Sequence, residues 1–223
     1  MTILAASAAG KPAEDPAGIP RPGWLSHLVG RWWFWVVFVL AMFTLIIART
    51  VTRVPPPVPK VLFTIPAFEL TSQDGKAFGT KQLAGKVWVA NFIFTSCPGP
   101  CPELTKRMQY LQHHTRNAAQ AVHLVTFTVD PENDTPQKLA DYGRAHRYNP
   151  VRWTFLTGDT KTVEETIVKG FKLAMGEEAP GQIFHSERFV LVDRRGGVRG
   201  LYEATDQGMA ALLRDIGVVL NKT

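Results

Sequence analysis

The sequence predicts a three-layer α/β sandwich preceded by a single transmembrane helix. Three observations favour this architecture: an uncharged apolar run near the amino end, a proline-rich segment after it, and strand-like and helix-like segments that alternate over the rest of the chain. The last stretch, about 160 residues, is long enough for one domain with a hydrophobic core. The expected layout is a tail over 1–31, an anchor over 32–48, a linker over 49–60 and a folded domain over 61–223.

The anchor is expected from Trp32 to Ala48, a run that carries no charge and is bracketed by Arg31 and Arg49. As a helix this run would rise about 25 Å, the short end of what a hydrocarbon core of about 30 Å requires. An aromatic belt typical of a membrane interface lies at one end of the run, at Trp24, Trp32, Trp33 and Trp35. Because no A-x-A-like cleavage site follows, an uncleaved anchor is favoured over a signal peptide.

Charge bias does not orient the anchor, because equal numbers of basic residues lie near its two ends. A short tail before the span and a folded domain after it fit a signal anchor whose amino end stays in the cytoplasm while the carboxyl-terminal domain is exported. The first thirty residues contain Glu14 and Asp15 and lack an Arg-rich amphipathic pattern, which argues against a mitochondrial transit peptide. We therefore expect a single-pass protein of a bacterial inner membrane, with the carboxyl-terminal domain facing the periplasm.

The linker contains VPPPVP at residues 54–59, which predicts a stiff and extended spacer. The formal charge of the chain is +6, and residues 1–60 hold most of it, with six basic and two acidic side chains. The domain itself shows no stripe of Lys and Arg interleaved with aromatic residues. Binding to nucleic acid is therefore disfavoured.

The first half of the domain predicts a hairpin, a buried strand and a helix. Residues 67–70 and 76–78 flank an Asp-Gly turn, which indicates a small hairpin. Residues 87–94 are apolar on both faces, as in a central strand of a parallel sheet. Proline suits the first helical position, so a helix is expected to start at Pro102, with Cys101 as its N-cap, and to end near Thr115. Its buried stripe would be Leu104, Met108 and Leu111.

The second half continues the alternation. Residues 122–129 predict a strand, and Asp134-Thr135-Pro136 predicts the cap and start of a helix that runs to about Arg147. Its inner side would carry Leu139, Tyr142 and Ala145 or His146. Further on, we expect a strand over 153–156, a helix over 160–171, a hairpin formed by 188–192 and 198–202, and a final helix over 206–220.

The chain has two cysteines, and they stand together in Cys97-Pro-Gly-Pro-Cys101 at the carboxyl end of the predicted central strand. Ligands bind at this end of the strands in open α/β sheets. Three prolines follow Cys97, Gly99 and Cys101, so the loop is expected to be extended and stiff. Backbone N–H groups and the positive end of the following helix would favour thiolates, which bind metals and attack disulfides.

The cysteine pair by itself leaves more than one interpretation open. A static disulfide would close a five-residue loop and contribute about 2 kcal/mol, which makes it a poor structural staple. A reactive pair is therefore favoured over a structural one. The C-x-x-x-C spacing is one residue wider than that of disulfide oxidoreductases, which leaves both redox exchange and metal binding possible.

Residues 60–220 resemble the Sco (SenC/PrrC-like) family of membrane-anchored, thioredoxin-fold copper proteins that serve cytochrome c oxidase assembly. Three separated motifs carry the resemblance: FTSC with the CPGPCP loop at 94–102, VDPENDTP at 129–136, and His185-Ser186 before a strand that ends in Asp193. The resemblance implies a thioredoxin-like three-layer sandwich with an N-terminal β-hairpin. It also implies that Cys97, Cys101 and His185 bind copper and that Asp130 is an acidic position near the site.

The resemblance implies a copper metallochaperone that delivers copper to the dinuclear copper site of the oxidase's copper-bearing subunit and exchanges it with other copper chaperones. Two thiolates and one imidazole suit Cu(I), and an added oxygen ligand would suit Cu(II). Zinc is a weaker rival because a closed zinc site needs a fourth ligand. The alternative is a thiol:disulfide reductase that uses Cys97 and Cys101 as a redox pair, so enzymatic activity stays open. A peroxidase is disfavoured because Phe94 stands where a hydroxyl residue is expected.

Three acidic or imidazole side chains have competing interpretations. His185 lies 84 residues beyond Cys101, so only the fold can bring it to the sulfurs. Asp130 fits a turn at the end of a strand as well as a position beside the metal ligands, and Asp134 fits a helix cap. No chemical role is expected for His27, His113, His114, His123 or His146.

Overall fold

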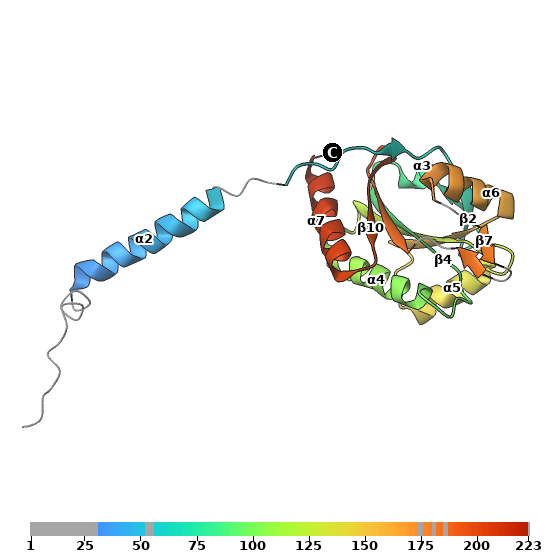
Figure 1. Ribbon diagram of the computed structural model, residues 1–223, viewed down its shortest axis with the longest axis horizontal. Coiled ribbons are helices and arrows are strands. Elements are labelled where there is room, and N and C mark those ends of the chain that lie inside the picture. Colours follow the sequence, from blue (N-terminus) through green and yellow to red (C-terminus); the bar gives the residue numbers. More distant parts are fainter. Residues whose placement is uncertain (1–30, 52–55, 174–175, 180–181, 185–186, 223) are drawn as a thin grey trace, which may run out of the picture. The chain divides into compact units, whose positions relative to one another are not determined.

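The computed structural model describes residues 31–51, 56–173, 176–179, 182–184 and 187–222. The contacts divide the chain between Pro55 and Pro56 into two units (Figure 1). The first described unit is the helix α2, Trp32–Val51, and the second is the α/β domain. Each unit is described by itself.

Helix α2 is apolar along its whole length, and Arg49 is its one basic residue, in the last turn. Its side chains are not buried by the rest of the chain, and the segment Trp32–Thr50 is long and apolar enough to cross a membrane. The helix extends three residues beyond the predicted end at Ala48.

The domain is built around an eight-stranded mixed sheet of order β1-β10-β9-β4-β5-β6-β2-β3. Its centre is parallel: β4 pairs with β5, and β5 pairs with β6. The antiparallel strand β9 lies on the other side of β4. The strands are β1 Phe63–Thr64, β2 Glu69–Ser72, β3 Ala77–Gly79, β4 Val87–Ile93, β5 Val122–Thr128, β6 Trp153–Thr157, β9 Arg188–Val192 and β10 Gly197–Glu203.

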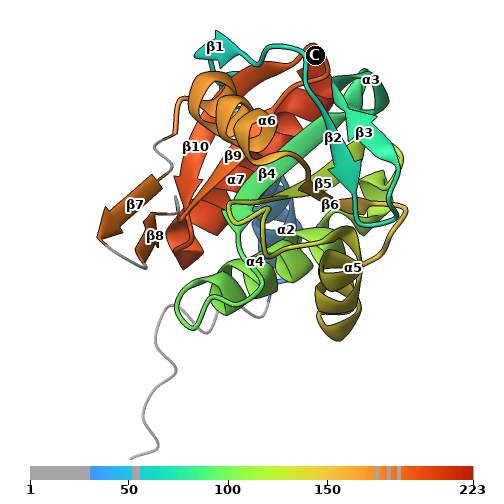
Figure 2. The ribbon, with the colours of Figure 1, turned by 90° about the vertical axis from the view of Figure 1, so that its right-hand side faces the viewer.

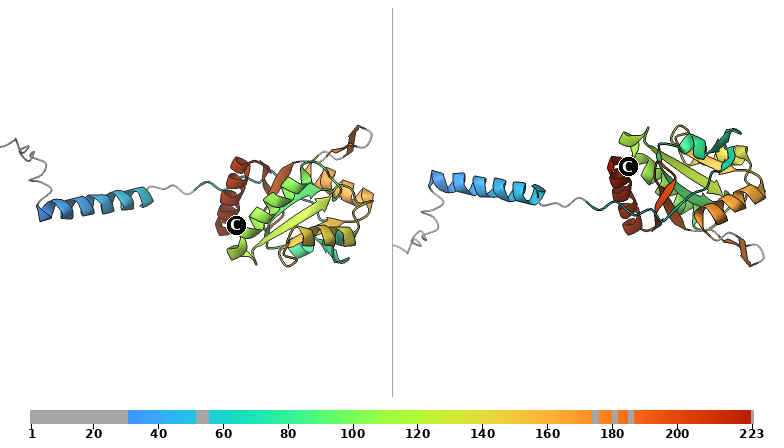
Figure 3. Two further views of the ribbon diagram at one scale, coloured as in Figure 1. Left: turned by 90° about the horizontal axis from the view of Figure 1, so that it is seen from below. Right: turned by 90° about the horizontal axis from the view of Figure 1, so that it is seen from above.

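Helices cover both faces of the sheet and complete the three layers (Figures 1 and 2). One face carries α4, Cys101–His114, α5, Pro136–Ala145, and α7, Asp206–Lys222. The other face carries the short α3, Thr80–Leu83, and α6, Thr160–Glu165, which continues as the π-helix η2, Thr166–Gly170. A separate hairpin of β7, Gly176–Ala179, and β8, Gln182–Phe184, extends away from the main sheet (Figure 3).

Strand β4 explains why the sheet needs two helical layers, because all seven of its residues are buried. Val87, Val89 and Ile93 pack towards α4 and α7, while Trp88, Ala90 and Phe92 pack towards α6. The period of two in side-chain direction therefore places one apolar row in each core. This arrangement fixes β4 as a rigid central strand, and its carboxyl end leads into the cysteine loop.

A buried chain of polar groups crosses the parallel strands. Trp153 Nε1 donates to Thr126 Oγ1 at 2.8 Å, and Thr126 donates to Asn91 Oδ1 at 2.6 Å. The three side chains belong to β6, β5 and β4 in that order. Because buried polar groups without partners are costly, these bonds specify how the strands lie against one another.

The predicted three-layer α/β sandwich is confirmed, together with each predicted strand and helix. The Asp-Gly turn joins β2 to β3 as expected, and Gly75 adopts the positive φ of 72° that this turn requires. Strand β1 and the β7–β8 hairpin were not predicted. Helix α5 ends at Ala145 rather than at Arg147, and its buried side includes Leu139 and Ala140, whereas Ala145 is exposed.

Candidate functional site

The cysteine pair lies at the carboxyl end of β4, on the turn into α4. The Cys97 backbone N–H donates to the Phe94 carbonyl at 3.3 Å, which closes the turn after the strand. Helix α4 begins at Cys101, one residue before the predicted start, and its N-cap is Pro100 rather than Cys101. Pro100 has φ −75° and ψ −18°, close to helical values, so its carbonyl accepts from the Leu104 N–H at 3.0 Å.

Both cysteines are buried thiols that are not joined by a disulfide. Cys97 is 8 % exposed and Cys101 is 1 % exposed, and both belong to the core beneath α4. Burial and, after it, a hydrogen bond with the Cys97 side chain raise the pKa of Cys101 to about 12, while a hydrogen bond with the Phe94 backbone opposes this shift. The expectation of a thiolate at Cys101 is therefore wrong, because burial outweighs the helix terminus.

Thr105 and Tyr142 support the start of α4 from inside the domain. Thr105 Oγ1 donates to the Cys101 carbonyl at 2.8 Å and lies 2.7 Å from the Tyr142 hydroxyl. Thr105 has one hydroxyl proton, so Tyr142 is the donor in the second contact. Burial raises the pKa of Tyr142, and the Coulombic influence of Cys101 adds to the rise. Helix α5 is thereby connected to the backbone of the second cysteine.

Asp134 is a buried carboxyl group whose role the sequence did not reveal. It has no exposed surface, and it accepts hydrogen bonds from the Thr95 N–H at 3.0 Å, from the Thr95 hydroxyl, and from the Thr128 hydroxyl at 2.5 Å. Its proposed role as the helix cap is wrong, since Thr135 is the N-cap of α5 and accepts from the Lys138 N–H at 3.3 Å. The missed partner, Thr95, lies 39 residues away, so no local pattern signals the contact.

Asp130 lies in the turn after β5 and is partly exposed. Both of its carboxylate oxygens accept from Asn133 Nδ2 at 3.0 Å, and its backbone N–H donates to Thr128 Oγ1 at 3.0 Å. Its carbonyl accepts from the Asp134 N–H at 2.9 Å. These contacts match the interpretation of Asp130 as a turn residue.

His185 lies outside the described residues, and the described part of β8 ends at its neighbour Phe184. Within the described ranges, no three His, Cys, Asp or Glu side chains are grouped as metal ligands would be. His113 and His114 are exposed on α4, whereas His123 is buried in β5 and bonded to Thr154 Oγ1 at 2.9 Å. His27 also lies outside the described residues.

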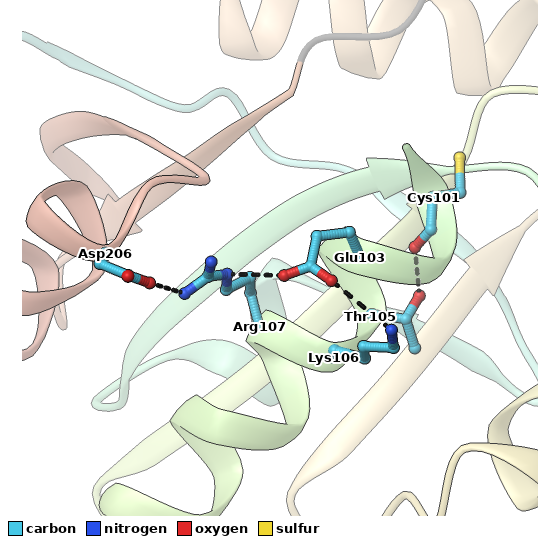
Figure 4. Close-up of polar contacts among 6 residues, drawn as sticks. All are labelled: Cys101, Glu103, Thr105, Lys106, Arg107 and Asp206. Carbon is cyan, nitrogen blue, oxygen red and sulfur yellow. Dashed lines mark hydrogen bonds and ion pairs between the residues drawn. The ribbon is translucent and has the colours of Figure 1, made fainter. Parts of the chain in front are cut away.

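An ion-pair cluster ties the first turns of α4 to the start of α7 (Figure 4). Arg107 Nε lies 3.0 Å from Glu103 Oε1, and the same guanidinium pairs with Asp206. Cys101 lies two residues before Glu103 in the first turn of α4, and its sulfur points away from the ion pairs in Figure 4. The cluster is exposed on the Asp206 side, so it positions α4 rather than adding much stability.

Residues 60–220 match the SCO1/SenC family model. Among curated proteins, the chain is 34 % identical over 146 residues to the SCO1 protein homolog of Bacillus subtilis, an alignment that covers 65 % of this chain and 76 % of the relative. It is 31 % identical over 140 residues to a protein of Stutzerimonas stutzeri named as copper-binding, covering 61 % of this chain and 67 % of that one.

Solved structures agree with the fold. A SCO1/SenC family lipoprotein of Bacillus anthracis str. Ames superposes with a TM-score of 0.68 at 32 % identity, covering 73 % of this chain and 99 % of the neighbour. BsSco, whose structure is described as showing a disulfide switch in a member of the Sco family of cytochrome c oxidase assembly proteins, superposes with a TM-score of 0.66 at 30 % identity. The second alignment covers 75 % of this chain and 100 % of BsSco.

Proposed function

Because the chain belongs to the SCO1/SenC family, we propose that it is a copper metallochaperone that delivers copper to the dinuclear copper site of cytochrome c oxidase during assembly. The observation that carries the proposal is the juxtaposition of two cysteine side chains, hydrogen-bonded to one another, on a turn at the carboxyl end of the central strand. Relatives named as copper-binding and as oxidase assembly proteins support the same metal and pathway.

Copper is the cargo in this proposal, and Cys97, Cys101 and His185 are its ligands. Two sulfurs and an imidazole form a soft donor set that suits three-coordinate Cu(I). The sulfurs bind as thiolates, so the Cys101 proton leaves when the metal arrives. A three-ligand site also leaves room for an incoming ligand of the recipient, which is what transfer by ligand exchange needs. Asp130, in the turn after β5, is assigned a place near the site and no direct bond to the metal.

A thiol:disulfide reductase is the second candidate, and the contact between the two cysteine side chains together with the disulfide switch named for BsSco favours considering it. In that reaction one sulfur attacks a disulfide in the recipient and the other resolves the mixed disulfide. The recipient gains two thiols, while Cys97 and Cys101 lose two protons and two electrons as they form their own disulfide. This activity would keep the copper-site cysteines of the oxidase reduced.

The location that fits either activity is the outer side of a bacterial inner membrane. Helix α2 would anchor the protein, with its amino end inside and the domain in the periplasm. The partner would be the copper-bearing subunit of the oxidase, and other copper chaperones would load the site.

The test is a Cu(I) competition titration of the full-length chain in detergent against a chromophoric chelator. We expect one Cu(I) per wild-type chain. Removing a group that hydrogen-bonds to a metal ligand typically weakens metal affinity 10- to 100-fold. Removing a ligand itself should have a larger effect, so we expect a loss of more than about 100-fold in each of Cys97→Ser, Cys101→Ser and His185→Ala. His113→Ala is the matched control, because His113 is exposed on α4 and contacts Arg116. Wild-type affinity in His185→Ala would contradict the ligand set.

A second experiment, with His185→Ala, distinguishes copper transfer from disulfide reduction. Copper transfer to an isolated oxidase copper-site domain should be lost in this variant, whereas reduction of a disulfide in that domain needs only the two thiols. A variant that still transfers copper at the wild-type rate would contradict the assignment of His185 as a ligand, whereas a wild-type chain that reduces the disulfide but transfers no copper would contradict the metallochaperone proposal.

A further inference from the structure

Residues 134–142 contact both ends of the cysteine loop. At one end, Asp134 accepts from the N–H and the hydroxyl of Thr95, two residues before Cys97. At the other end, Tyr142 contacts Thr105, which donates to the Cys101 carbonyl. The five-residue loop is therefore connected at its two ends to one stretch of chain, which runs from the residue before the cap of α5 to Tyr142 in its second half.

The contact at Asp134 is unusually demanding. Its carboxyl group is completely buried, its partners are two threonines, and no cationic side chain forms an ion pair with it among the residues that the structure describes. Burying a carboxylate without a counter-ion is costly unless several hydrogen bonds offset the lost hydration. Asp134 accepts three hydrogen bonds, and two of them come from Thr95, next to the cysteine loop, so this buried carboxyl group ties that loop to the end of β5.

We propose that Asp134 is a positioning residue of the cysteine pair, which holds Thr95 against Thr128 and so fixes the start of the cysteine loop in the geometry of the dithiol. The sulfurs are in hydrogen-bond contact, whereas a disulfide needs them about 2.05 Å apart with a constrained dihedral angle. Closing that distance moves at least one end of the loop. Bonds that fix both ends oppose the movement and therefore oppose oxidation.

The reaction that measures this effect is exchange with glutathione. The two thiols and one glutathione disulfide give one protein disulfide and two glutathione thiols, so electrons and protons balance. If Asp134 holds the loop, releasing it makes the protein disulfide easier to form. The inference rests on the proposed site only in taking Cys97 and Cys101 as the reacting groups, and it does not require copper.

Asp134→Ala and Asp134→Asn distinguish the effect of the hydrogen bonds of Asp134 from the effect of its charge. Alanine removes every acceptor at the site. Asparagine keeps its carbonyl oxygen for the Thr95 N–H and the Thr128 hydroxyl, and its amide can donate to the Thr95 hydroxyl. In full-length chains in detergent, we expect the equilibrium constant for oxidation by glutathione disulfide to rise about tenfold in Asp134→Ala. It should stay within threefold of wild type in Asp134→Asn.

Asp193 supplies the matched control. It is also buried, and it accepts from the Arg195 N–H at 2.9 Å, the Gly197 N–H at 2.8 Å and Arg199 Nε at 2.7 Å. It follows β9, whose Val192 pairs with Trp88 at the opposite end of β4 from the cysteines. Asp193→Ala should therefore lower thermal stability and leave the oxidation constant within threefold of wild type.

The outcomes are decisive in each case. The proposal is overturned if the oxidation constant of folded Asp134→Ala rises less than threefold or falls. It is also overturned if the constant rises equally in Asp134→Asn, because the charge of Asp134 rather than its hydrogen bonds would then be responsible. If Asp134→Ala does not fold, Thr95→Val carries the test: it must raise the constant more than threefold while Thr95→Ser does not. A separate Cu(I) titration of wild type distinguishes failure of this inference from failure of the copper proposal.

Discussion

The Tyr142 hydroxyl lies 2.7 Å from Thr105 Oγ1, and the Thr105 hydroxyl donates to the carbonyl oxygen of Cys101. A side chain of α5 is thus bonded to the first turn of α4, where the second cysteine lies. Cys101 itself is buried in the apolar core beneath this turn. Its low exposure and its raised pKa follow from the same packing.

The first prediction concerns the reactivity of Cys101. With a pKa of about 12, its thiolate fraction near pH 7.5 is lower than that of an ordinary thiol of pKa 8.5 by roughly three thousandfold. Alkylation by iodoacetamide, followed by peptide-resolved mass spectrometry, should be slow in the native chain and rise about tenfold per pH unit up to pH 9.5. The denatured chain serves as the control, and equal native and denatured rates at pH 7.5 would contradict the assigned environment.

The second prediction concerns stability in acid and depends on His123. Burial, aided by the charges of Lys86 and Arg152, lowers the pKa of His123 to about 4 from an ordinary value of 6.5. The folded state therefore resists protonation, so stability is complete above pH 6.5 and falls by about 3 kcal/mol as the pH drops to 4. Thermal unfolding at pH 7.5 and pH 4.5 measures this loss.

His123→Gln is the control for that experiment. Glutamine keeps a polar group near Thr154 and has no titration in this range, so most of the loss between pH 6.5 and pH 4 should disappear. An unchanged loss in the variant would assign the acid sensitivity to other groups.

The third prediction concerns the polar chain through the sheet. Thr126→Val keeps the shape of the side chain but leaves Trp153 Nε1 without an acceptor and Asn91 Oδ1 without a donor. Each buried group left unpaired costs about 1–3 kcal/mol, so the variant should unfold several degrees below wild type. Thr126→Ser, which retains the hydroxyl, should lie close to wild type. Equal melting temperatures for the two variants would contradict a structural role for the chain.

The fourth prediction separates the cap of α5 from the neighbouring carboxylate. Thr135 accepts from the Lys138 N–H, so Thr135→Ala should cost about 1 kcal/mol, which thermal unfolding can detect. Thr135→Ser should restore the cap. A stability loss of this size in Thr135→Ala with an unchanged glutathione equilibrium distinguishes capping from the positioning proposed for Asp134.

The order of the elements was predictable because apolar runs and turn residues are local signals. Residues 87–94 are apolar throughout, and β4 is buried on both faces at Val87–Ile93. Strand β1 was not predictable in the same way, because its two residues pair with β10, more than 130 positions away. The strands of the β7–β8 hairpin have only four and three residues, too few to show the alternation that marks a half-buried strand.

The site shows the same division between local and distant causes. The position of the cysteines after β4 followed from the strand and the prolines. The state of Cys101 did not, because its pKa depends on how deeply the loop is buried rather than on the adjacent helix terminus. Asp134 and Thr135 both suit an N-cap, and only the distant Thr95 decides which of them serves the helix.

The central claim is that two sulfurs and one imidazole bind the copper, and X-ray absorption at the copper edge tests it most directly. The Cu(I)-loaded full-length chain should show two sulfur neighbours and one imidazole nitrogen, and His185→Ala should lose the nitrogen while His113→Ala keeps it. An absorption spectrum with two sulfur neighbours alone in the wild-type chain would contradict the claim.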